Sequence, residues 1–109
     1  MRKSDIVDVI ATATGLTKVE TEAVVDGFIS TVINALKEGK YIEIRGFGSF
    51  KVKKRKSRIA RNPRTGEQVK VDDHFVPLFK ASRELKNIVN ENLKRTQFDI
   101  ESSNLTENN

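Results

Sequence analysis

The chain of 109 residues contains no cysteine and no tryptophan, and it has one histidine, one tyrosine and two prolines. Without cysteine it can form neither disulfide bonds nor thiolate metal sites. His74 stands beside Asp72 and Asp73, and no second histidine is present to complete a nucleophile–base pair or a metal site. We therefore expect no enzymatic activity, no bound metal, no cofactor and no small-molecule substrate.

Long apolar runs are also missing from the sequence. No stretch approaches the roughly 18 unbroken apolar residues that a membrane helix needs, and the first five residues lack the apolar run of a signal peptide. A mean hydropathy of -0.48 and a hydrophobic content of 37% are ordinary for a globular protein. The sequence therefore predicts a cytoplasmic protein with no membrane partner.

Positive charge is concentrated in one segment. The whole chain has 20 basic and 15 acidic residues, for a formal net charge of +5. Residues 51–70 contain one acidic residue, Glu67, against nine basic ones: Lys51, Lys53, Lys54, Arg55, Lys56, Arg58, Arg61, Arg64 and Lys70. Such a segment repels itself unless a polyanion neutralises it, so nucleic acid is the expected partner.

The first 40 residues predict two helices. The first ends at Gly15, and a capping box of Thr17 and Glu20 starts a long second helix that ends near Glu38. We predict that a second copy of the chain covers the apolar stripe of this helix across a two-fold axis, because one small domain offers too little partner surface. The alternative is that the chain's own sheet covers the stripe. The stripe consists of Val24, Val25, Phe28, Ile29, Val32, Ile33 and Leu36.

The middle of the chain predicts a small sheet. Alternating apolar residues indicate a strand at residues 41–44, a returning strand through Phe50 with Phe47 buried at the turn, and a third strand at residues 75–79. The proline in the third strand places it at an edge of the sheet or places the proline on its non-bonding side. Ser82 is expected to cap a last helix.

Residues 53–73 contain few apolar side chains and predict a protruding arm. A turn at Asn62-Pro63-Arg64-Thr65-Gly66 allows Lys53–Arg61 to pair with Glu67–Asp73 as an antiparallel ribbon. At about 3.3 Å per residue, nine residues reach roughly 30 Å, and a two-stranded ribbon has the width to enter a DNA groove. From the residues alone, Pro63 at the tip is equally suited to form the turn or to wedge between base pairs.

Three motifs together resemble the bacterial HU and integration host factor family of histone-like proteins. They are Gly46-Phe47-Gly48-Ser49-Phe50, then Arg55-x-x-Arg58-x-x-Arg61-Asn62-Pro63-Arg64-Thr65-Gly66, then Pro77-x-Phe79 with Leu85-Lys86. The resemblance defines a DNA-binding domain over residues 1–94, with its arm at about residues 53–73. Residues 95–109 lie outside it and form a polar tail that we expect to be disordered. Ala60 and Ser82 stand where the family usually has glycine, which affects how closely the backbone approaches phosphate.

The resemblance implies an α+β fold: an intertwined homodimer with a helical base, a small antiparallel sheet and a protruding two-stranded β-ribbon arm in each subunit. It also implies a nucleoid-associated architectural protein, which binds double-stranded DNA through the minor groove and bends, wraps or condenses it with weak or no sequence specificity. The dimer core would combine Phe28 and Val32 of the helical stripe with Phe47, Phe50 and Phe79. Pro63 would intercalate, and the expected DNA-binding residues are Lys3, Lys53, Arg55, Arg58, Arg61, Asn62, Pro63, Arg64, Arg83 and Lys86.

Some alternatives stay open at this point. One chain does not separate a nonspecific DNA bender from a site-selective one of the integration host factor type, or a homodimer from a heterodimer with a related subunit. A module that binds RNA or an acidic protein with the same arm is the competitor from another class. The ribbon width and the tip proline disfavour it, because A-form RNA has a deep, narrow major groove and a shallow minor groove.

Overall fold

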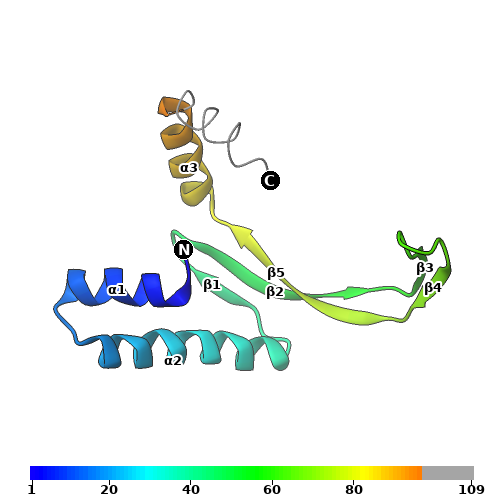
Figure 1. The fold of residues 1–109 in the computed structure, drawn as a ribbon, viewed down its shortest axis with the longest axis horizontal. Helices are drawn as coiled ribbons and strands as arrows, with labels where there is room; N and C mark the ends of the chain where they lie inside the picture. Colours follow the sequence, from blue (N-terminus) through cyan, green and yellow to red (C-terminus); the bar gives the residue numbers. More distant parts are fainter. Residues whose placement is uncertain (97–109) are drawn as a thin grey trace. The chain divides into compact units, whose positions relative to one another are not determined.

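The computed structural model describes residues 1–96, which form an α+β fold of two compact units, Met1–Lys40 and a second that begins at Tyr41. The last helix runs to Arg95, one residue beyond the expected boundary of the domain. The rest of the expected disordered tail lies outside the described residues. In chain order the elements are α1 (Lys3–Thr14), α2 (Lys18–Lys37), β1 (Ile42–Ile44), β2 (Gly48–Arg55), β3 (Arg58–Arg61), β4 (Gln68–Val71), β5 (His74–Ala81) and α3 (Arg83–Arg95) (Figure 1).

The first unit consists of α1 and α2, whose ends are set by local hydrogen bonds. Gly15 follows α1 with φ of 80°, a left-handed conformation that glycine adopts without strain. At the start of α2 the Glu20 N–H donates to Thr17 Oγ1 at 3.1 Å, and the Thr17 N–H donates to Glu20 Oε1 at 3.2 Å. The predicted capping box is confirmed.

The two helices of the first unit bury few side chains. Val7 and Ala11 of α1 and Thr21 of α2 are buried, and the Thr21 hydroxyl donates to the Thr17 carbonyl at 2.8 Å. The apolar stripe of α2 stays open in the single chain, where Phe28 is 51% exposed. Exposed apolar area on this scale requires a further covering surface.

The second unit contains a three-stranded antiparallel sheet in the order β1-β2-β5. β5 is an edge strand, which is one of the two placements that its proline allows. On one face of the sheet Phe79 lies opposite Phe50, with ring centroids 4.9 Å apart, and the ring of Phe47 lies 5.1 Å from that of Phe79. Phe47 was expected to be buried in the core, and that expectation is wrong for the single chain, where Phe47 is 44% exposed.

The ribbon extends from this sheet in one continuous register. β2 and β5 run side by side and lead into β3 and β4 (Figure 1). The residue pairing keeps the same register from the pair Gly48–Ala81 at the inner end to the pair Arg61–Gln68 near the tip. The expected pairing of Lys53–Arg61 with Glu67–Asp73 is therefore corrected at its inner end, where Lys53 pairs with Val76. The turn at the tip fixes this register, so two paired residues are the same number of positions away from the turn on the two strands.

The last helix begins directly after β5. Ser82 Oγ accepts from the Leu85 N–H at 3.0 Å, which confirms the predicted cap, and the Ser82 N–H donates to the Phe47 carbonyl at 2.9 Å. This bond joins the start of α3 to the β1–β2 turn. The apolar side chains of α3 stay exposed in the single chain, with Ile88 at 65%.

Candidate nucleic-acid interface

One face of the sheet is polar and basic, in contrast to the phenylalanine face. Side chains alternate between the two faces along a strand, and directly opposed residues share a face. The pairing Ser49–Lys80, Lys53–Val76 and Arg55–His74 therefore places lysine and arginine on the face opposite Phe50 and Phe79. Val76 and Leu78 share this face with the cations, so it offers a negatively charged ligand both positive charge and aliphatic surface.

All nine basic residues of the segment 51–70 are exposed. Among the described residues, one of the nine has an ion-pair partner: Lys54, whose Nζ lies 3.9 Å from Asp73 Oδ2. The others have no carboxylate within ion-pairing distance in the part of the chain that the structure describes. The arm is thus a surface of largely unneutralised positive charge.

The tip of the arm is organised by Asn62. Its N–H donates to the Glu67 carbonyl at 2.8 Å, its carbonyl accepts from the Gly66 N–H at 2.7 Å, and its side-chain oxygen accepts from the Arg64 N–H at 2.9 Å. Gly66 has φ of 76°, as the predicted turn requires. The bond to Arg64 occupies the Asn62 oxygen and leaves its NH₂ group as a donor. Pro63 is held in an exposed position between these bonds.

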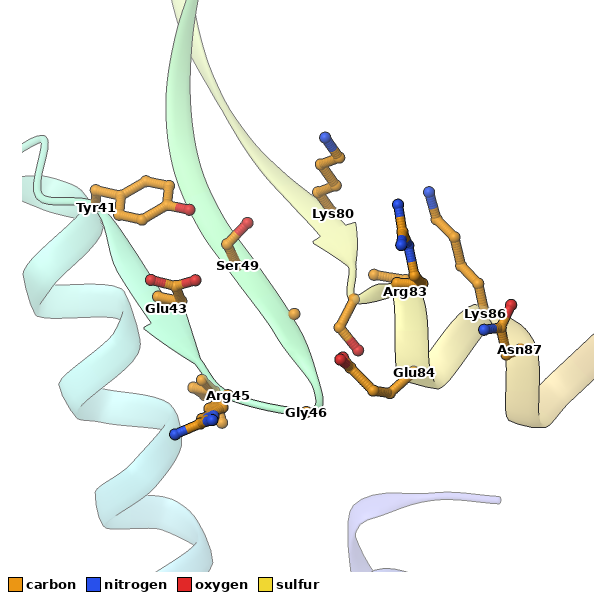
Figure 2. Close-up of a pocket in the computed structure, with 14 residues that line it drawn as sticks. Tyr41, Glu43, Arg45, Gly46, Ser49, Lys80, Arg83, Glu84, Lys86 and Asn87 are labelled. Atoms are coloured by element: carbon orange, nitrogen blue, oxygen red, sulfur yellow. The ribbon is translucent and has the colours of Figure 1, made fainter.

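A second basic site lies at the base of α3. A hollow of about 550 Å³ is bordered by the β1–β2 turn, the end of β5 and the first turn of α3. Figure 2 shows the charged ends of Lys80, Arg83 and Lys86 pointing the same way, whereas Glu84 points away from them. The free N–H groups at the start of a helix add partial positive charge to such a site. Its four cations, Arg45, Lys80, Arg83 and Lys86, outnumber its two carboxylates, Glu43 and Glu84, so the hollow suits a phosphate.

A further hollow, of about 470 Å³, lies along the inner half of the arm. Arg55, Lys56 and Arg58 line it together with Val76 and Leu78. Its surface combines cationic ends with aliphatic side chains, which suits the sugar–phosphate chain of a nucleic acid: phosphate for the cations and the sugar face for the apolar groups. This hollow continues the basic face from the sheet into the arm.

Lys3 belongs to the first unit and is paired in the free chain. Its Nζ lies 2.8 Å from Asp26 Oδ1 and 3.9 Å from Glu22 Oε1. The hydrogen bond with Asp26 and its negative charge raise the pKa of Lys3 above its ordinary value. A phosphate contact by Lys3 therefore has to compete with Asp26, which the sequence did not indicate because the two residues are 23 positions apart.

The structure brings several of the expected contact residues together and places one further basic residue beside them. Lys53, Arg55, Arg58, Arg61 and the tip residues follow one ribbon, and Arg83 and Lys86 share the hollow at the base of α3. Lys80 lines the same hollow and was missed, because the expected strand stopped at Phe79. Extending the alternation by one residue would have placed Lys80 on the polar face.

Comparison with known proteins gives a consistent result. The family model described as "Bacterial DNA-binding protein" matches residues 1–90. The chain is 40% identical over 89 residues to the DNA-binding protein HU-alpha of Vibrio cholerae, covering 82% of this chain and 99% of the relative. It is 42% identical over 87 residues to the DNA-binding protein HU of Streptococcus mutans, covering 80% and 96%. A cocrystal structure of Anabaena HU with DNA is similar with a TM-score of 0.76 and 35% identity, covering 82% of this chain and 97% of that one.

Proposed function

The chain belongs to the family of bacterial DNA-binding proteins that includes HU, and on that premise we propose that it is an architectural protein that binds, bends and wraps duplex DNA. The observation that carries the proposal is the arm: a ribbon of exposed, largely unpaired cations with a rigid proline at its tip. Cations of this density bind phosphates without reading sequence. An apolar wedge between base pairs kinks the duplex.

The contacts divide into three groups by their chemistry. Lys53, Arg55, Arg58, Arg61 and Arg64 bind phosphates and the minor groove along the arm, and Asn62 donates from the tip. Pro63 intercalates. At the base of α3 a separate group holds the flanking DNA after the bend: Lys80, Arg83 and Lys86. Lys3, in the first unit, is a further phosphate contact.

The working form is a dimer, which presents one arm from each subunit to the DNA. The exposed apolar side chains of α2 and α3, with Phe28 at 51% and Ile88 at 65%, supply the surface that a second copy covers. Phe28, Val32, Phe47, Phe50 and Phe79 form its shared core. Sedimentation at micromolar concentration should give twice the chain mass of 12.3 kDa, and a stable monomer would contradict this assembly.

The protein acts by binding and not by catalysis. The Nδ1 atom of its one histidine, His74, lies 2.9 Å from the backbone carbonyl oxygen of Asp72. This contact is with the backbone and not with a side chain that could take part in catalysis. A nucleoid location follows from duplex DNA as the ligand. The weak sequence preference follows from contacts that reach phosphates and groove width rather than base edges; a site-selective bender remains the alternative within this class.

Competition between ligands tests the proposal against an RNA-binding or acidic-protein module. A labelled DNA duplex of about 40 base pairs is bound by the protein and displaced with unlabelled duplex DNA, duplex RNA of the same sequence or polyglutamate. We expect duplex DNA to compete at the lowest concentration, because the minor groove of B-form DNA admits the ribbon tip. Displacement at equal concentrations by duplex RNA or by polyglutamate would contradict it.

A further inference from the structure

Strand pairing in the ribbon is interrupted at one place. β2 pairs with β5 as far as Arg55 and His74, and β3 pairs with β4 from Arg58 and Val71 outward. Residues 56–57 and 72–73 cross the gap without strand geometry. The register is the same on both sides, so the gap is not a β-bulge with an inserted residue. It is a local loss of ladder bonds at the point where the outer arm begins.

Two side chains bond to the backbone inside this gap. The Asp73 carboxylate accepts through Oδ1 from the backbone N–H of Ser57, in the segment that faces it between β2 and β3. His74 Nδ1 contacts the Asp72 carbonyl on its own strand, and the carbonyl can only accept, so Nδ1 carries the proton in this contact. Of these two hydrogen bonds, the one made by Asp73 joins the two sides of the arm across the gap.

A carboxylate at this position is unfavourable for binding a polyanion. Asp73 Oδ2 lies 3.9 Å from Lys54 Nζ, and Asp73 shares a hollow of about 430 Å³ with Lys54, Lys56 and Ser57. In a DNA-binding arm, a negative charge here repels phosphate and competes with it for lysine. The carboxylate therefore needs another function to offset that effect, and its bond to the Ser57 N–H provides one.

We propose that Asp73 is a positioning residue for DNA bending: its bond to Ser57 fixes the direction of the outer arm (β3, the tip turn and β4) relative to the β2–β5 ribbon. The inference rests on the proposed function, because the direction of the arm matters only if the arm enters DNA. A two-stranded ribbon with little to bury is marginally stable in water. One charge-assisted hydrogen bond at its interrupted point therefore has a large influence on how freely the outer arm swings.

Three variants separate this role from the effect of charge. Asp73→Ala removes the bond and one negative charge. Asp72→Ala removes the same charge from the neighbouring position, where the structure gives the carboxylate no hydrogen bond among residues 1–96. Asp73→Asn keeps an oxygen that can accept from Ser57 and loses only the charge. All three substitutions replace an exposed residue, and circular dichroism verifies that each variant is folded.

Two measurements are made on the full chain. Hydrogen exchange of the Ser57 amide, followed by NMR in the free protein, reports the bond itself. Fluorescence energy transfer between the ends of a duplex of about 35 base pairs, at saturating protein, reports the bend. We expect the Ser57 amide to exchange on the order of tenfold faster in Asp73→Ala than in Asp72→Ala, and the bend to be smaller in Asp73→Ala than in the other two variants.

The outcomes are distinguishable. Faster Ser57 exchange together with a smaller bend in Asp73→Ala, and values near wild type in Asp73→Asn, support the positioning role. Equal bends in Asp73→Ala and Asp72→Ala overturn it, whether or not the exchange rates differ. A wild-type protein that leaves the duplex straight contradicts the proposed function itself, and the role of Asp73 with it.

Discussion

Gly48 approaches Phe79 so closely that no side chain fits between them. A Cβ atom built on Gly48 would lie 2.6 Å from Phe79 Cζ and 2.5 Å from the backbone oxygen of Lys80. Gly48 is buried and pairs with Ala81 at the start of the β2–β5 ribbon. Position 48 therefore accepts only glycine, because the ring of Phe79 and the backbone of Lys80 occupy the space that a side chain would need.

Gly48→Ala should destabilise the protein. The added methyl group must displace either backbone or an aromatic ring, and overpacking of this kind costs typically about 1–3 kcal/mol. Gly27→Ala is the matched control, because a Cβ at Gly27 in α2 meets nothing within 4 Å and alanine favours a helix by roughly 0.5–1 kcal/mol. Urea unfolding measures both. Equal stability of the two variants would contradict the close approach of Gly48 to Phe79.

The capping box at α2 predicts a pH dependence. Hydrogen bonds from the Thr17 hydroxyl and backbone hold the pKa of Glu20 below its ordinary value of 4.5. A carboxyl whose pKa is lowered in the folded state stabilises the fold above its unfolded pKa, and this stabilisation is lost as pH falls through the folded pKa. Thr17→Ala should raise the pKa of Glu20 in an NMR titration and lower the melting temperature more at pH 7 than at pH 3. A Glu20 pKa that does not change in Thr17→Ala would argue against this cap.

Phosphate binding by the arm predicts a steep salt dependence. The logarithm of the binding constant should fall by about 0.9 per log unit of salt for each phosphate contacted. Arg58→Gln should reduce that slope by roughly one unit. Lys40→Gln is the control, because Lys40 is already paired with Glu38 at 2.8 Å and lies outside the expected contact residues. Identical slopes in wild type and Arg58→Gln would remove Arg58 from the interface.

Pro63→Ala should separate bending from binding. The turn at the tip is held by bonds to the backbone and side chain of Asn62, which the substitution leaves in place. The variant should therefore keep most of its affinity, since affinity comes from phosphate contacts. Its bend angle should decrease, because alanine is too small to unstack a base step as proline does. Equal bend angles, measured by fluorescence energy transfer, would show that Pro63 only forms the turn.

Sequence reasoning succeeded where structure is set by neighbouring residues. The cap at Thr17 and Glu20, the turn at Asn62 and the cap at Ser82 each depend on groups within five positions of one another. Their chemistry is therefore visible in a short window of sequence. The proline of β5 limited that strand to an edge or its own residue to a non-bonding side, because proline lacks the N–H of a ladder bond, and the strand lies at an edge.

The sequence did not reveal relationships that depend on register or on distant packing. Asp73 meets the Ser57 N–H across 16 positions, and Lys3 meets Asp26 across 23. Neither residue type indicates its partner, because a carboxylate or an ammonium group binds whatever the fold places near it. Phe47 was expected to be buried at the β1–β2 turn, but it is 44% exposed in the single chain, because burial depends on which surfaces the fold or a partner brings against a side chain.

Ring closure of short DNA tests the central claim, that this protein bends the duplex. A linear duplex of about 100 base pairs is shorter than the persistence length of roughly 150 base pairs and closes poorly under ligase. We predict that added protein produces monomeric circles in proportion to its occupancy of the DNA. Full occupancy of the duplex, shown by gel shift in the same buffer, with no increase in circles would contradict the account.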